Sequence, residues 1–124
     1  MLLLQCVIGY TAVLTLMETE CEYKTAHTLL TLKTRLQPHV TFYMEKEMEL
    51  AKLYAKCDDK GDVIFSDTGS FTFLDPTRAG EYTKSRTELQ SVTIDEEFNI
   101  ITCPPPPKIS PVHLEALAPF INFS

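Results

Sequence analysis

Residues 21–57, CEYKTAHTLLTLKTRLQPHVTFYMEKEMELAKLYAKC, decide the fold of this chain. A helix brings residues three and four positions apart onto one face, and the large apolar side chains of this stretch recur at those intervals. They are Leu29, Leu32, Leu36, Val40, Tyr43, Leu50 and Leu53. Glu and Lys fill the other positions and indicate a face in water. The stretch therefore predicts one long helix, from about Cys21 to Cys57.

Pro38 lies inside this helix. Proline removes one backbone hydrogen bond, here to the Thr34 carbonyl, and its ring crowds the same carbonyl, so we expect a kink or a break. An unbroken helix of about 36 residues would be about 54 Å long, whereas a compact domain of this size has a radius of gyration of only ~14 Å. Either Pro38 divides the helix, or another subunit covers the overhang. We expect a kinked helix together with self-association.

The segment before this helix is also apolar. Leu3, Val7, Tyr10, Leu14 and Met17 recur at intervals of four and three, which predicts a first helix. Residues 18–20, Glu-Thr-Glu, then form a polar turn, so the two helices should fold back as an antiparallel αα-hairpin over residues 1–57. The segment lacks the positive charge of a signal peptide and is shorter than a membrane span of roughly 20 residues. We therefore expect no membrane insertion.

After Asp58 the apolar residues no longer recur at helical spacing. Val63–Phe65 and Phe71–Leu74 flank a turn at 67–70 and predict a hairpin, and Val92–Ile94 and Phe98–Thr102 predict two more short strands. Asp75-Pro76 and Ser110-Pro111 are typical of helix starts and predict two short helices. The fold class is α+β: a helical hairpin (1–57) beside a portion (58–124) with a small antiparallel sheet and two short helices, in one domain.

The charge is uneven along the chain. Of 124 residues, 11 are Lys or Arg and 17 are Asp or Glu, a net charge of −6. Residues 1–57 contain six acidic and six basic side chains. Residues 58–124 contain eleven acidic and five basic side chains, so the whole excess of negative charge lies in the second half. An acidic chain is a poor general binder of nucleic acid or of anionic membranes. An electrostatic partner should meet the region after Asp58.

Motifs of catalysis and metal binding are absent. The chain has no G-x-S-x-G, P-loop or H-E-x-x-H sequence, and its four cysteines (Cys6, Cys21, Cys57 and Cys103) are not in C-x-x-C spacing. The Asp58–Asp62 turn misses the calcium-loop pattern. We therefore predict no enzyme, no cofactor, no metal and reduced cysteines in the cytoplasm. An enzyme whose acid and base have no sequence signature stays open as a third hypothesis.

Two basic groups are candidates for binding a phosphate or a carboxylate. Lys33 and Arg35 lie beside the expected kink, and Arg78, Lys84 and Arg86 lie in the acidic half. The alternative is that they are solvated surface charges. The proline run 104–107 fits a P-x-x-P ligand, but the apolar helix after it favours a stiff spacer.

The order of these pieces resembles a family of small proteins of unknown function that tailed phages and prophages of Gram-positive bacteria encode. The resemblance covers most of the chain. It rests on KTAHTLL (24–30) at the start of the long helix, the DKG turn (59–61), the Glu88-Leu89 pair and ISPVHLEALAPFI (109–121). Pro38 and the four-proline run depart from the pattern. The family carries no catalytic or binding residues to transfer.

This resemblance implies a phage protein made in an infected bacterium. One hypothesis is a non-enzymatic accessory protein that binds a host factor, such as an inhibitor of an antiphage defence system or a sponge for a nucleotide signal. The alternative is a virion assembly or structural component. Small size, acidic charge and expected self-association through the helical hairpin favour the first. Its partner would be a host protein or a small anionic ligand.

Overall fold

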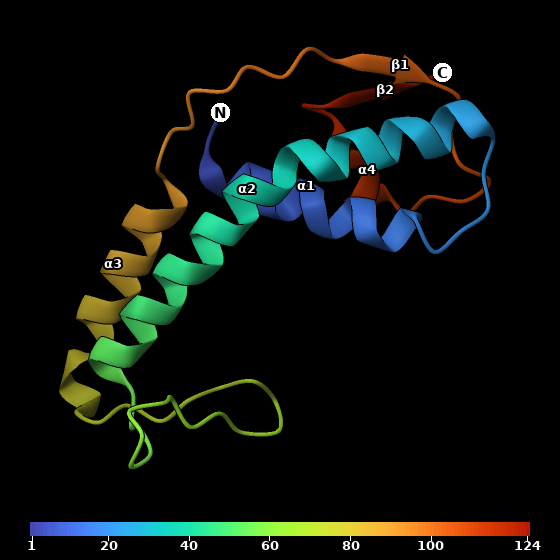
Figure 1. Cartoon of the computed structure of the whole chain (residues 1–124). Helices are drawn as coiled ribbons and strands as arrows, with labels where there is room; N and C mark the ends of the chain where they lie inside the picture. Colours follow the sequence, from blue (N-terminus) through green and yellow to red (C-terminus); the bar gives the residue numbers. More distant parts are fainter.

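The computed structural model describes all 124 residues and has an α+β fold (Figure 1). Its elements in chain order are α1 (Leu3–Leu16), α2 (Tyr23–Tyr54), the 3-10 turn η1 (Pro76–Arg78), α3 (Ala79–Gln90), β1 (Ile101–Cys103), α4 (Pro111–Leu117) and β2 (Ile121–Phe123). Figure 1 shows α1 and the first half of α2 side by side and antiparallel, which confirms the helical hairpin. No helix of the protein is both long and apolar enough to cross a membrane.

The buried face of α1 differs from the predicted stripe. Leu3 is buried as expected, but Leu14 and Met17 are exposed, and the helix instead buries Leu3, Cys6, Gly9, Ala12, Val13 and Leu16. The helix is apolar on every side, so hydrophobic periodicity does not select one face. Small residues decide the orientation because they let α1 approach its neighbours closely. At Gly9 an added Cβ would lie only 2.6 Å from Cε2 of Phe120.

Helix α2 continues through Pro38 and bends about halfway along (Figure 1). The kink is confirmed and the break is not observed. The predicted face is buried through Leu29, Leu32, Leu36, Val40 and Tyr43. Beyond the bend the prediction is wrong, because Leu53 is 67% exposed and Ala51 faces inward instead. The overhanging half of α2 is covered by α3 of the same chain (Figure 1), so covering this overhang requires no second subunit.

The predicted antiparallel sheet is wrong. The two strands are parallel, with Ile101 opposite Ile121 and Cys103 opposite Phe123. Parallel neighbours need a long crossover connection, usually helical, and residues 104–120, which contain α4, supply it. The proline run is the rigid first part of this crossover. Pro106 is buried, and the Pro104 carbonyl accepts a 2.6 Å hydrogen bond from the buried Thr25 hydroxyl, an arrangement that favours the spacer interpretation.

The other predicted strands are reduced to single bridges. Residues 55–73 form antiparallel bridges at Ala55–Phe73, Cys57–Val63 and Phe65–Phe71, and Val92–Ile94 contributes one bridge, Leu2–Thr93. The turns between them are as expected: Gly61 and Gly69 have φ of 83° and 79°, a conformation that favours glycine. Both helix starts are confirmed, since Asp75 and Ser110 accept hydrogen bonds from backbone amides of η1 and α4.

The packing separates a body from an arm. The body comprises α1, the first half of α2, β1, α4 and β2, and it contains the main core of eleven buried residues, from Cys6 to Ile121. The arm comprises the second half of α2, residues 55–78 and α3 (Figure 1). Ala51 and Ala55 are the buried residues near the end of α2, so the arm has a thinner core than the body.

Candidate functional site

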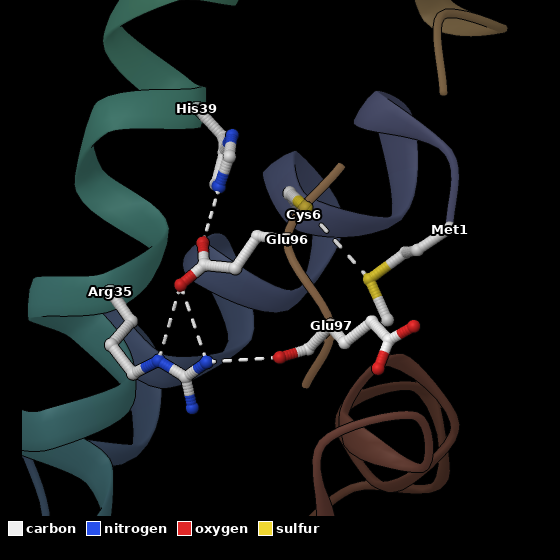
Figure 2. Close-up of polar contacts among 6 residues, drawn as sticks. All are labelled: Met1, Cys6, Arg35, His39, Glu96 and Glu97. Carbon is white, nitrogen blue, oxygen red and sulfur yellow. Dashed lines mark hydrogen bonds and ion pairs between the residues drawn. The ribbon is translucent and has the colours of Figure 1, made fainter. Parts of the chain in front are cut away.

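Arg35, one of the predicted binding residues, is already occupied by the chain itself. Its guanidinium donates to Oε1 of Glu96 at 3.2 and 3.3 Å and to the Glu97 carbonyl at 3.1 Å, and it lies 4.5 Å from the centre of the Phe98 ring. His39, one turn along α2, lies 2.6 Å from Oε2 of Glu96 (Figure 2). The hydrogen bond from His39, and then the contacts with Arg35, hold the pKa of the Glu96 carboxyl below its usual range.

The Arg35–His39–Glu96 cluster has a structural position. Arg35 and His39 flank Pro38 at the bend of α2, and Glu96 belongs to the segment between α3 and β1. The cluster therefore ties that segment to the bend. Lys33 does not join it: it is half-buried and makes no ion pair, and residues two positions apart on a helix do not share a face. The sequence-predicted pair is thus not brought together.

The second predicted group lies on the arm. Arg78 pairs with Glu81 at 3.0 Å and covers the Tyr54 ring at 4.7 Å, whereas Arg86 pairs with Glu47 of α2 at 3.3 Å. Lys84 is exposed and makes no ion pair. Two of the three cations therefore already face a carboxylate. Anion binding by this group stays a prediction, with less free positive charge than the sequence alone indicates.

The arm has a pocket that the sequence prediction missed. It has a volume of about 400 Å³, a size at the lower end of ligand pockets. Three segments form it: α2 contributes Met44, Met48 and Ala51, residues 65–73 contribute three phenylalanines, and α3 contributes Tyr82 and Arg86. The walls are mainly apolar, and the Arg86–Glu47 ion pair forms part of them.

Aromatic contacts fix the walls of this pocket. Phe71, Phe73 and Tyr82 meet edge to face, with ring centres 5.2 to 5.6 Å apart, a favoured geometry for aromatic pairs. Burial raises the pKa of the Tyr82 phenol. The alternation of Phe71 and Phe73 was the available signal, because it places both rings on one side of an extended segment. Their meeting with Tyr82 depends on the docking of α3.

The segment beside the pocket is strongly acidic. Residues 57–75 contain five Asp (58, 59, 62, 67 and 75) and one Lys (60), which gives a net charge of −4. Asp58 accepts hydrogen bonds from the Lys60 and Asp62 amides, and Asp75 accepts from Thr77, so these two carboxylates shape turns. The remaining three are exposed and face solvent at this end of the molecule.

The Cys6 thiol, near the Glu96 cluster, does not contact its histidine. Figure 2 shows the Cys6 thiol directed toward Met1, 3.9 Å from its sulfur, rather than toward His39. Burial raises the pKa of Cys6 to about 11, which keeps it protonated and unreactive. All four cysteines are free. His27 stacks on Tyr23. No three His, Cys, Asp or Glu side chains gather closely enough to hold a metal ion.

The candidate site is therefore the arm pocket with its acidic segment. The geometry suits non-covalent recognition, because mainly apolar walls with one ion pair can bind an apolar side chain and orient a polar group beside it. No protein-family model, curated protein or solved structure matches the chain.

Proposed function

We propose that the protein is a non-enzymatic accessory protein of a phage or prophage, and that its arm binds a host protein in the cytoplasm of the infected bacterium. An inhibitor of an antiphage defence system fits this proposal. The observation that carries it is the mainly apolar pocket of the arm, which lies outside the main core and is lined partly by exposed side chains.

Several apolar side chains that line this pocket are exposed to solvent. Met44 is 63% exposed, and Met48 and Phe65, which also line the pocket, are exposed as well. A contiguous apolar patch with a polar border is typical of a protein-binding surface. Residues that served only the arm's own packing would be buried, as Ala51 is.

Charge favours a protein over a nucleotide as the partner. A nucleotide needs cations that are free to meet its phosphates. Arg78 and Arg86 are already paired with Glu81 and Glu47, and the neighbouring segment carries a net charge of −4. The same charges suit a host protein with a basic surface, for example one that itself binds nucleic acid.

The test is affinity purification of the tagged protein from infected cells, followed by quantitative mass spectrometry. Two variants make it specific: Met44→Glu places a charge in the arm surface, and Val112→Glu places the same charge at a 71% exposed site on α4 of the body. Circular dichroism checks that both fold. We expect one host protein to be enriched by the wild type and by Val112→Glu, and to be lost with Met44→Glu.

Two results contradict the proposal. Recovery of virion proteins alone would support the alternative of a virion assembly or structural component. Equal retention of the host protein by both variants would place its binding site away from the arm.

A further inference from the structure

We propose that the arm pocket is a socket for one large apolar side chain, leucine, methionine or phenylalanine, which projects from a basic segment of the partner protein. This inference rests on the proposed function and adds the chemistry of the partner. The pocket would receive the apolar side chain, and the acidic segment beside it would meet the flanking Lys and Arg residues.

The inner walls of the socket are preformed. Backbone hydrogen bonds from Lys56 to Thr72 and from Leu74 to Tyr54, both 2.9 Å, fix the segment that carries Phe71 and Phe73 to the end of α2. The edge-to-face contacts with Tyr82 fix it to α3. A partner therefore loses little free energy to the ordering of these walls when it binds.

The mouth of the socket is adaptable. Met44 and Met48, adjacent on one face of α2, and Phe65 line the pocket and are exposed at its rim. Unbranched methionine side chains can adjust to apolar groups of different shape. A fixed interior with a methionine rim suits a single inserted side chain better than a flat protein surface.

Charge selects the kind of partner. Asp59, Asp62 and Asp67 are exposed and make no ion pair, so they are available to basic residues of a partner, and Asp67 lies in the turn next to the pocket residues Phe65 and Gly69. A second copy of this chain is a poor occupant, because each copy has a net charge of −6 and the two acidic segments would repel each other.

Three nine-residue peptides test the socket with the intact protein. The first has a central Leu flanked by Lys and Arg, the second replaces the central Leu with Ala, and the third keeps Leu but has Glu and Asp flanks. Amide chemical-shift changes in NMR titrations measure weak binding and locate it. We expect the first peptide to shift the amides of Phe65 to Phe73 and to bind at least about tenfold more tightly than the second, since burial of a leucine side chain supplies the difference.

Protein variants test the two parts separately. Met48→Glu should weaken binding of the first peptide and abolish its preference over the alanine peptide. The triple change Asp59→Asn, Asp62→Asn and Asp67→Asn should weaken the binding of both basic peptides and reduce its dependence on salt concentration. Asp95→Asn, an exposed carboxylate outside the arm, is the matched control and should leave binding unchanged.

The proposal is overturned if the leucine and alanine peptides bind equally, if the acidic peptide binds as tightly as the basic one, or if no peptide binds at millimolar concentration. Each of these results would leave the purification experiment unaffected, because that experiment asks whether a host protein binds the arm at all. A failed purification with selective peptide binding would instead reject the host partner and retain the pocket chemistry.

Discussion

Gly9 offers a sharp test of how α1 packs. The glycine is buried below Phe120, and a Cβ at this position would lie 2.6 Å from Cε2 and 3.3 Å from Cδ2 of that ring. Phe120 is itself 1% exposed and packs edge to face on Phe98 at 5.2 Å. The ring therefore has no open space to move into, and in Gly9→Ala the helix must shift away from it.

The magnitude follows from two opposing effects. Overpacking a core by one methyl group costs about 1–3 kcal/mol, whereas replacing glycine by alanine within a helix gains up to about 1 kcal/mol. We expect Gly9→Ala to lower the free energy of unfolding by up to about 2 kcal/mol. Gly80→Ala in α3 is the matched control, because its added Cβ has no heavy atom within 4 Å and only the gain, about 0.5 kcal/mol near a helix start, remains.

Thermal and urea unfolding followed by circular dichroism measure the difference. For a domain of this size, 1 kcal/mol corresponds to roughly 4 °C in Tm. Gly80→Ala should melt slightly above the wild type and Gly9→Ala below it. The double variant Gly9→Ala/Phe120→Leu should lose less stability than the two single changes predict together, because the smaller side chain makes room for the methyl group. If Gly9→Ala is as stable as Gly80→Ala, the close contact with Phe120 is refuted.

Three further predictions concern the core, the Glu96 cluster and the thiols. Leu117→Ala should cost about 2–5 kcal/mol in urea unfolding, because Leu117 is fully buried, whereas exposed Leu114→Ala should cost far less; similar losses would contradict the placement of α4. Glu96→Gln should lower the free energy of unfolding at pH 7. Because folding lowers the pKa of Glu96, its carboxylate stabilises the fold above about pH 4.3, and this stabilisation is lost as the pH falls further. The unfolding free energies of the wild type and of Glu96→Gln should therefore become equal in acid. A difference that persists there would show that the ionised carboxylate is not its cause. Alkylation followed by mass spectrometry should label exposed Cys57 first and buried Cys6 last, and early labelling of Cys6 would show that α1 is not packed as described.

The sequence predicted the helices and turns well because their signals are local. The stripe from Leu29 to Tyr43 identified the body half of α2, and the two predicted turns, at 58–62 and 67–70, contain the glycines with positive φ. Pro38 predicted the bend, since proline in a helix interior removes a backbone hydrogen bond. These properties depend on neighbours within a few residues, so a single chain displays them.

Contacts between distant segments leave no local signal in the sequence. Glu96 lies 57 residues from His39 and 61 from Arg35, and no spacing rule connects them. The predicted basic groups do not form binding clusters, because Arg35, Arg78 and Arg86 each form an ion pair with a glutamate of the same chain. The arm pocket was missed for the same reason: Phe71 and Tyr82 come together only when α3 docks.

The chain by itself determined where helices begin, bend and end, and it placed the excess negative charge after Asp58. Tertiary structure alone decided which face of the uncharged α1 is buried, because many of its sides are equally apolar and the fit of Gly9 against Phe120 selects one. It also decided that the strands run parallel, since the register of Ile101 with Ile121 requires α4 to cross between them. Local propensity depends on adjacent residues, whereas pockets and sheets depend on surfaces that only packing brings together.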